Sequence, residues 1–556
     1  MARSPLIKIL RRAYRVSQIS RKLDIPPAEV LGILNERISR RHLLHGGLAV
    51  AAAVAATTFS RDGHRAVAQS GISPILVVGA GIAGLTAAYR LKQAGVPVNI
   101  IEARNRVGGR MRSLPNAAGT KLTAELGGEF IDTDHTCLRS LAKELGLKIV
   151  DLLAAEQGLV HDTYFFEGRK VPIEEIIRDF APVAKQISAD LKAIANFESY
   201  AVFDEPTAKL DRISIAEYLD RITTTPIIQQ LIRVAYTIEY GRDVEEQSCL
   251  NLLYLIGTEP GEFSIFGTSD ERFYIDGGND QVPRRLAQLL AGSIQTGTVL
   301  ESLKRLSDGR YRVALRSGGS TIDRTYERIL LTVPFSVLRE IPLNADLPPV
   351  KRLAIKTLGC GTNAKLITGY QKQVWRTRYG STANVYTDLG FQNTWESSQS
   401  RYTPGKGLIT DYTGGSQGLL LGTATPEIQA QRLVRQLERV FPGISAVRLQ
   451  GRAERAYWPG EAYTRGSYAC YLVGQWTQLN GVEGERVGNL FFAGEHTSLD
   501  YQGYMEGGCE TGEAVAISIL KDLGVKADAA QQSARVVKNR MARLHQRGRF
   551  RFRLPA

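Results

Sequence analysis

A short apolar run followed at once by a glycine-rich loop is the feature that most constrains the fold of this chain. Residues 75–78 read Ile-Leu-Val-Val, with the length and β-branched content of a buried parallel strand. The loop GAGIAG at 79–84 comes next, helical spacing continues over 85–94, and a second apolar run at 97–101 ends at Glu102. This order of strand, loop, helix, strand and acid is typical of a Rossmann-like unit that binds a dinucleotide.

Each glycine of the loop has a physical role in such a unit. Gly79 permits the tight turn, Gly81 lets the backbone approach a pyrophosphate, and Gly84 lets the helix pack closely on the strand. The pyrophosphate is expected at the helix N-terminus, where free N–H groups and the helix dipole favour an anion. Glu102 can accept hydrogen bonds from a ribose 2′-hydroxyl and would repel a 2′-phosphate, so NADP is disfavoured.

A basic segment that contains a glycine pair follows Glu102 directly. Residues 103–110 read Ala-Arg-Asn-Arg-Val-Gly-Gly-Arg. The first two of these arginines and the glycine pair, so close to the ribose acid, would place positive charge and close backbone along a second stretch of diphosphate. A solvated basic turn is the alternative interpretation of the same residues.

The net charge of +14 is concentrated at the two ends of the chain. Residues 1–41 and 521–556 together carry slightly more than all of it, so residues 42–520 are close to neutral. Neither end has aromatic residues on a recognisable nucleic-acid-binding framework, and we expect no nucleic-acid partner. The basic tail, 526–556, is interpreted as a flexible extension that can contact an acidic surface or an anionic membrane.

The N-terminal region has the pattern of a twin-arginine signal peptide. Arg40 and Arg41 precede a mildly apolar stretch at 43–59, and Ala-Val-Ala at 66–68 provides the small residues of a cleavage site. We therefore expect the twin-arginine translocase to export the folded protein to the periplasm or an equivalent extracytoplasmic compartment. A membrane anchor is the alternative, although the stretch is short and weakly hydrophobic for a span. Residues 1–38 have no assigned role.

The five cysteines are scattered along the chain. They form no CxxC pair and no cluster with histidine, so we expect no metal site. An odd, dispersed set also argues against a disulfide framework, while a single bridge stays open. The five are Cys137, Cys249, Cys360, Cys470 and Cys509.

Four further segments, at 125–131, 297–299, 490–497 and 501–508, carry a resemblance to a known family. They resemble the acid-x-Gly-Gly segment, the adenine-contacting strand and the closing motif of the flavin amine oxidases. That family includes the monoamine, polyamine and L-amino acid oxidases, and the resemblance covers about 73–520. It implies FAD as the cofactor, and it implies that FAD is held by Gly79, Gly81, Gly84, Glu102, Arg104, Gly109, Arg110, Gly127, Gly128, Val299, Gly494, Glu495 and Met505.

The closing motif also makes physical sense by itself. Residues 491–494 read as a buried strand that ends in a glycine, with Glu495 placed to bond the ribityl hydroxyls. A helix is predicted over 512–520, and the turn before it could direct N–H groups at the pyrimidine edge of the flavin. His496 is interpreted as a structural histidine, because the resemblance gives that position no role in proton transfer.

The resemblance assigns the catalytic side chains. Tyr468 and Tyr504 match the aromatic cage over the flavin, and a packed core position is the alternative for either ring. Lys365 matches the lysine that holds a water against flavin N5 and stabilises negative charge while O₂ reoxidises the flavin. Ser467 stands where some monoamine oxidases carry the cysteine that binds flavin covalently. A serine hydroxyl cannot form that thioether, so non-covalent FAD is expected.

The substrate is less constrained. L-Amino acid oxidases usually carry an arginine that grips the substrate carboxylate at the position that Phe130 occupies here. The absence of that arginine favours a mono- or diamine, with Glu129 as a contact for a second ammonium. Arg272 or Arg465 could still supply a clamp, so an L-amino acid oxidase acting on basic or aromatic amino acids is the alternative.

The expected fold class is α/β: a Rossmann-like FAD-binding domain with an inserted α+β substrate domain. Residues 151–267 are expected to be rich in helix, although Pro182 could break or kink the first helical run. No internal repeat is present, and a homodimer is compatible with the sequence. The segments are a leader at 1–72, FAD-domain pieces at 73–150, 268–345 and 476–525, substrate-domain pieces at 151–267 and 346–475, and the tail at 526–556.

The expected reaction is oxidative deamination of a primary amine by hydride transfer to flavin N5, with O₂ reduced to H₂O₂. Two alternatives come from other classes of protein. One is an FAD-dependent desaturase or isomerase, which would share the glycine loop but would not need Tyr468, Tyr504 or Lys365. The other is a non-catalytic flavoprotein that docks through its basic tail.

Overall fold

The structure is a computed structural model that describes residues 71–194, 197–398 and 405–525. The predicted signal peptide and basic tail lie outside these residues. Within the described ranges, every helix is too short or too polar to span a lipid bilayer.

A five-stranded parallel sheet forms around the predicted glycine-loop unit. Its strand order is β22-β13-β1-β2-β9, and neighbouring strands run parallel. The strands come from all three segments that the sequence assigns to the FAD domain, and the sheet confirms the α/β prediction. Their bounds are β1 Ile75–Val78, β2 Val98–Ile101, β9 Ile294–Gln295, β13 Ile329–Leu331 and β22 Leu490–Phe492.

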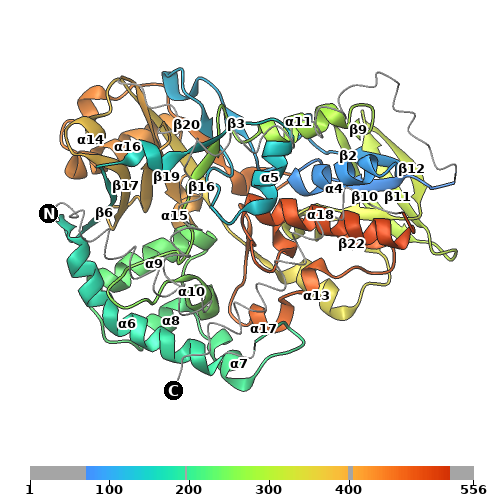
Figure 1. Ribbon diagram of the computed structural model, residues 1–556, viewed down its shortest axis with the longest axis horizontal. Helices are drawn as coiled ribbons and strands as arrows, with labels where there is room; N and C mark the ends of the chain where they lie inside the picture. The colour runs from blue at the N-terminus through green and yellow to red at the C-terminus, as the bar shows by residue number, and fades with distance from the viewer. Residues whose placement is uncertain (1–70, 195–196, 399–404, 526–556) are drawn as a thin grey trace, which may run out of the picture. The chain divides into compact units, whose positions relative to one another are not determined.

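Both faces of this sheet are covered, which explains why β1 is apolar at every position. Ile75 and Val77 pack into a core with the helices, and Leu76 and Val78 pack into a second core with a β-meander. Figure 1 shows α4 and α18 side by side. The covering elements are α4 Ile82–Gln93, α5 Thr136–Glu144, α11 Gln281–Leu289, α18 Met505–Asp522, β10 Thr298–Arg305, β11 Tyr311–Ser317, β12 Ser320–Tyr326 and β14 Leu343–Asn344.

Helix α18 begins at Met505, well before the start predicted at residue 512. Glycines lower helix propensity, so the pair at 507–508, ahead of the predicted helix, reads as a turn. Tertiary packing requires these glycines: a Cβ on Gly508 would lie 2.7 Å from Ile82 Cγ2, and one on Gly512 would lie 2.4 Å from the Ala83 carbonyl oxygen. The predicted start was wrong because α4 and α18 approach too closely for side chains at these positions.

A seven-stranded mixed sheet forms from the segments assigned to the substrate domain. Its order is β20-β16-β19-β18-β17-β6-β7. Helix α16, Pro426–Val440, packs with it in a common apolar core. The strands are β6 Val160–Phe166, β7 Arg169–Val171, β16 Ala364–Tyr370, β17 Ser381–Thr387, β18 Asn393–Glu396, β19 Gly407–Thr413 and β20 Glu454–Tyr457.

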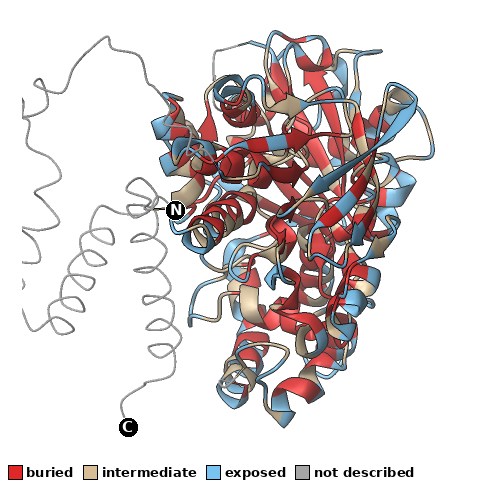
Figure 2. Ribbon diagram, turned by 90° about the vertical axis from the view of Figure 1, so that its right-hand side faces the viewer, coloured by how far each residue is buried: buried red, intermediate tan, exposed pale blue. Residues whose placement is uncertain are grey.

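The helix-rich region predicted within 151–267 is present. Phe180, Val183 and Ile187 of α6 lie buried in one core, and that helix continues through Pro182 without ending. Figure 2 shows buried residues along the strands and inner helix faces, with exposed residues towards the outside. The helices here are α6 Ile173–Ala193, α7 Glu205–Asp211, α8 Ile215–Leu219, α9 Pro226–Tyr240 and α10 Cys249–Leu255.

Short elements connect these larger parts. They are β3 Ser113–Leu114, β4 Ala124–Glu125, β5 Ile149–Asp151, β8 Phe273–Ile275, α12 Phe335–Leu338, α13 Pro349–Thr357, β15 Gly359–Cys360, α14 Val374–Thr377, α15 Gly415–Leu420, β21 Ala469–Cys470 and α17 Gln475–Leu479.

Candidate active site

A cavity of about 560 Å³ is lined by residues of the parallel sheet, its loops and the seven-stranded sheet. Cavities of this size are typical of sites for small molecules and cofactors. All but one of the residues predicted to contact cofactor or substrate line it. They are Gly79, Gly81, Glu102, Arg104, Gly109, Arg110, Gly127, Gly128, Glu129, Phe130, Val299, Lys365, Tyr468, Gly494, Glu495, Tyr504 and Met505.

Gly84 is the exception, and its surroundings explain why it is a glycine. A Cβ there would lie 2.1 Å from the Gly79 carbonyl oxygen and 3.1 Å from Val77 Cγ1. Gly84 thus lets α4 pack on β1, as the loop pattern predicts. Gly81 differs, because a Cβ there would meet no atom within 4 Å. The space next to Gly81, at the N-terminus of α4, is open to a ligand.

The acid after β2 is held by the backbone. One oxygen of the buried Glu102 carboxylate accepts from Ala80 N at 2.9 Å, and the other accepts from Arg104 N at 2.9 Å. A carboxylate has about four lone-pair sites, so both oxygens can still accept from ribose hydroxyls. The helix N-terminus and Glu102 therefore fit the pyrophosphate and ribose of FAD.

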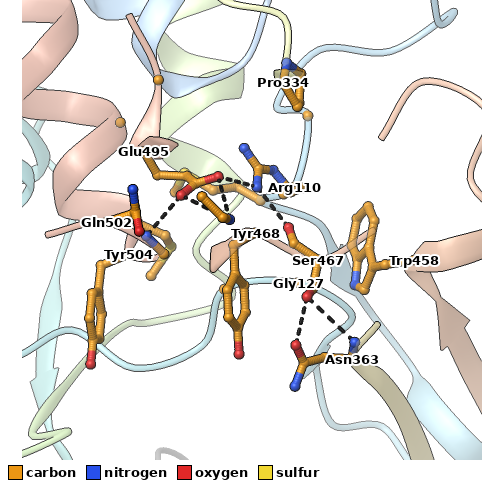
Figure 3. Close-up of a pocket in the computed structure, with 18 of the residues that line it drawn as sticks. Arg110, Gly127, Pro334, Asn363, Trp458, Ser467, Tyr468, Glu495, Gln502 and Tyr504 are labelled. Carbon is orange, nitrogen blue, oxygen red and sulfur yellow. Dashed lines mark hydrogen bonds and ion pairs between the residues drawn. The ribbon is translucent and has the colours of Figure 1, made fainter. Parts of the chain in front are cut away.

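Glu495 joins the two sequence-distant FAD motifs. Its carboxylate pairs with Arg110 Nη1 at 2.7 Å and accepts from Gly503 N at 2.8 Å, and the same Nη1 donates to the Ser467 carbonyl oxygen at 2.7 Å (Figure 3). Burial alone would raise the pKa of Glu495, but its bonds and the charge of Arg110 outweigh burial and lower the pKa. Glu495 is therefore ionised, and its ion pair holds Arg110 in place.

Tyr468 and Tyr504 lie next to each other, as an aromatic cage requires. Figure 3 shows the two rings side by side with their hydroxyls pointing the same way. The Tyr504 hydroxyl donates to Glu239 Oε1 at 2.9 Å, and the Tyr468 hydroxyl donates to the Glu239 carbonyl oxygen at 2.6 Å. Burial first, and then neighbouring groups, raise the pKa of both phenols. Both rings therefore stay neutral and fixed in position.

Lys365, on β16, is buried against the acid-x-Gly-Gly segment. Its Nζ donates to Gly127 O at 2.9 Å and Glu125 O at 3.2 Å, and it pairs with Glu129 Oε2 at 2.8 Å. Lys365 thus compensates the charge of Glu129 within the protein. This pairing leaves Glu129 less suited to hold a second ammonium of the substrate, the role that the sequence suggested.

The arginines considered as carboxylate clamps lie elsewhere. Arg272 pairs with Asp151 at 2.7 Å and Arg465 pairs with Glu340 at 3.3 Å, and neither lines the cavity. The arginines among the described lining residues are Arg104 and Arg110, both from the FAD motif at 103–110. The substrate end of the cavity therefore has no arginine among the described residues.

Sequence reasoning missed two carboxylates that line the cavity. Glu239 lies on α9, and Glu271 precedes β8 with a backbone φ of +43°, in the left-handed region that few non-glycine residues adopt. Burial raises the pKa of Glu239 to about 7 and that of Glu271 to about 8. Glu239 is the one acid of α9, and an acid in so apolar a helix was an available signal.

Further lining residues include one histidine and several aromatic side chains. His161 lies between Glu156 at 3.1 Å and Asp162 at 2.9 Å, and its bonds to these carboxylates raise its pKa to about 11. Its positive charge is therefore balanced locally. The aromatic residues beyond the cage include Phe130, Tyr240, Tyr254, Phe266, Tyr386, Trp395 and Tyr412.

The structure also shows the contacts of Ser467 and His496. The Ser467 hydroxyl donates to Asn363 Oδ1 at 2.6 Å, and no cysteine is among the described residues that line the cavity. His496 is buried, packs edge-on against Phe335 at 4.6 Å and does not line the cavity. Burial lowers the pKa of His496 to about 4, which agrees with a structural histidine.

Comparison with known proteins agrees with this geometry. Flavin-containing amine oxidase B from Canis lupus familiaris is 25% identical over 475 residues, which cover 82% of this chain and 88% of that protein. The Homo sapiens protein of the same name is also 25% identical, over 482 residues, covering 81% of this chain and 86% of that protein.

Solved structures share the fold. Cyclohexylamine oxidase from Brevibacterium oxydans superposes with a TM-score of 0.70 and 21% identity, covering 82% of this chain and 100% of that one. Wild-type putrescine oxidase bound to putrescine gives a TM-score of 0.68 and 19% identity, covering 81% and 99%. The family model of flavin-containing amine oxidoreductases matches residues 82–520. The chain therefore belongs to the flavin-containing amine oxidoreductase family, and its cofactor is FAD.

Proposed function

We propose that the protein oxidatively deaminates a primary amine that carries a second cationic group and no carboxylate, with O₂ reduced to H₂O₂. One observation supports this most strongly. Beyond the FAD motifs, the cavity is lined by the cage tyrosines and by Glu239 and Glu271, with no arginine among the described residues. Carboxylates at this end attract a cation and repel a substrate carboxylate.

The cage tyrosines orient the reacting amine. FAD, when bound, would supply the acceptor for the hydride equivalent of the carbon next to nitrogen and the route for the electrons to O₂. Tyr468 and Tyr504 are held by bonds to Glu239, so their rings form fixed walls for a neutral amine. Orientation by rigid walls is the main contribution that these side chains make.

We propose that Lys365 promotes the reoxidation of the flavin by O₂. Its Nζ is fixed by two carbonyl oxygens and by Glu129, so its charge does not have to reorganise during the reaction. A preorganised cation stabilises negative charge as it develops on oxygen.

The two acids missed by sequence reasoning are proposed to hold the second cation. The Glu271 carboxylate makes no hydrogen bond or ion pair within the described residues, and its side chain is accessible from the cavity although protein surrounds it. Glu239 uses one oxygen for Tyr504 and lies close enough for its charge to raise the pKa of Glu271. A bound ammonium would relieve this repulsion between like charges.

An L-amino acid oxidase is the second candidate function. Phe130 lines the cavity at the position where L-amino acid oxidases usually carry the arginine that grips the substrate carboxylate. The acids nearby would also disfavour a substrate carboxylate. Basic amino acids are the members of this class that the acids would attract, through their side chains.

A peroxide assay across substrates tests the proposal. The purified holoenzyme is given putrescine, spermidine, tyramine, lysine, arginine and phenylalanine, and H₂O₂ is recorded. We expect the highest kcat/KM with the di- and polyamines, lower values with tyramine and the lowest values with amino acids. Faster turnover of any amino acid than of every amine would reverse the assignment, and no peroxide with any compound would exclude an oxidase.

Non-covalent FAD is proposed from Ser467. Acid precipitation of the holoenzyme should leave all of the flavin in the supernatant, because no thioether anchors it. Flavin that remains with the precipitated protein would contradict this.

Export by the twin-arginine translocase is proposed from residues 40–41 and 66–68. Changing both arginines to lysine should retain the protein in the cytoplasm and leave an uncleaved leader, as fractionation and mass spectrometry would record. Unchanged export would contradict the assignment.

A further inference from the structure

The junction between α5 and α18 brings two distant cysteines together. Glu506, in the first turn of α18, accepts from Cys137 N and from Leu138 N, each at 2.8 Å. A carboxylate at this place satisfies free N–H groups of α5 and interacts favourably with its dipole. The first turns of the two helices are therefore held against each other.

One helical turn after Glu506, the side chain of Cys509 reaches α5. Its sulfur lies 2.9 Å from the sulfur of Cys137, across a sequence separation of 372 residues. Both are free thiols. A disulfide has an S–S distance of about 2.05 Å, so a closure of about 0.9 Å would form the bond. The remaining cysteines, all within the described residues, have no second sulfur at such a distance.

We propose that Cys137 and Cys509 form a reversible disulfide that locks the α5–α18 junction when the protein meets a peroxide or another thiol oxidant. In the peroxide reaction, one thiolate attacks an oxygen, gives a sulfenic acid and releases hydroxide, which takes up the thiol's proton as water. The second thiol attacks that sulfur and releases a second water. Two thiols are thus oxidised to one disulfide while one H₂O₂ is reduced to two waters.

Exposure indicates which cysteine reacts first. Cys137 is partly exposed, whereas Cys509 is completely buried. The contact with Cys509 and burial raise the pKa of Cys137, and burial raises that of Cys509. Because the thiolate is the nucleophile, bridge formation should be slow at neutral pH and faster at alkaline pH.

The disulfide would restrain the two segments that position one tyrosine of the aromatic cage. His135 precedes α5 and packs edge-on against Tyr504 and Tyr501, with ring centroids 5.3 Å apart in each case. Tyr504 is the residue directly before α18. Linking the two helices would therefore restrain a cage residue, and it would also constrain the unfolded chain across a very long loop.

Thiol counting tests the proposal. The reduced holoenzyme is treated with diamide or with H₂O₂, quenched, denatured and alkylated, and mass spectrometry counts the free thiols. We expect the count to fall from five to three, with a crosslinked pair of peptides that contain Cys137 and Cys509. The Cys137→Ser variant should lose none of its remaining thiols, and the matched control Cys249→Ser should still lose two.

Thermal unfolding provides a second readout. Oxidation should raise the Tm of the wild type and of Cys249→Ser by a few degrees. It should leave the Tm of Cys137→Ser unchanged. Full alkylation of all five cysteines after oxidation, or a crosslink between other cysteines, would overturn the proposal. Diamide makes this test independent of turnover, so its outcome is separate from that of the proposed amine oxidation.

Discussion

The two ends of the cavity are built in different ways. At the FAD end, the loop at 79–84, the N-terminus of α4 and Glu102 lie within one continuous stretch, and short motifs from three other segments complete the site. At the substrate end, the side chains come from separate elements: Glu239 from α9, Lys365 from β16, Tyr412 from β19, Glu271 from the segment before β8 and Tyr468 from the segment before β21. A local backbone site leaves a readable motif, whereas an assembled side-chain site leaves scattered residues.

The largest expected effect concerns two glycines of the same loop. Gly81→Ala should lower FAD affinity by about 100-fold or more without lowering the Tm of the apoprotein, because its Cβ meets only the space for the pyrophosphate. Gly84→Ala should instead destabilise the fold, by about 1–3 kcal/mol, because its Cβ would clash with the Gly79 carbonyl oxygen. Flavin titration and thermal unfolding of both apoproteins measure this. Equal effects of the two substitutions on Tm would contradict the conclusion that Gly81 borders the space for the ligand whereas Gly84 is required for packing.

Lys365→Met should mainly affect the oxygen step. Removing the fixed cation is expected to slow flavin reoxidation by about 100-fold while amine-driven reduction changes much less. Stopped-flow absorbance of the flavin separates the two half-reactions, and the exposed Lys356→Met serves as the control. Equal slowing of both half-reactions would instead assign Lys365 a structural role.

Glu271→Gln should reveal the second-cation contact. Loss of one carboxylate is expected to raise KM for putrescine by about 10-fold, which is about 1.4 kcal/mol, and to leave tyramine nearly unchanged. The exposed Glu262→Gln in the same segment is the matched control. A parallel rise in KM for both amines would count against a subsite for the second ammonium.

The smallest expected effect is on pH dependence. The pKa values of Glu239 and Glu271 are raised to about 7 and about 8, so both carboxyls are largely neutral at pH 6 and largely ionised at pH 9. Only the ionised form attracts the second ammonium, which stays protonated over most of this range. The ratio of kcat/KM for putrescine to that for tyramine should therefore rise several-fold from pH 6 to 9. A ratio that does not change between pH 6 and 9 would contradict the proposal that these two acids bind the second ammonium.

Some local features could be misread even at the FAD end. The glycines of α18 favour a turn by propensity, yet they lie inside a helix because α4 leaves no room for side chains. Glu129 was chosen for its place beside the flavin segment, but β16 brings Lys365 to it from 236 residues away. In both cases a contact between distant segments overrides what the neighbouring residues suggest.

The sequence alone determined the dinucleotide loop, the family to which the chain belongs and FAD. These depend on backbone conformation and short motifs, whose requirements are local and therefore visible in residue order. Only the tertiary structure decided that Glu129 is neutralised by Lys365, that Glu239 and Glu271 line the cavity, and that Cys137 meets Cys509. Charge balance and sulfur contact are set by distances in space between segments hundreds of residues apart, and no local pattern encodes such distances.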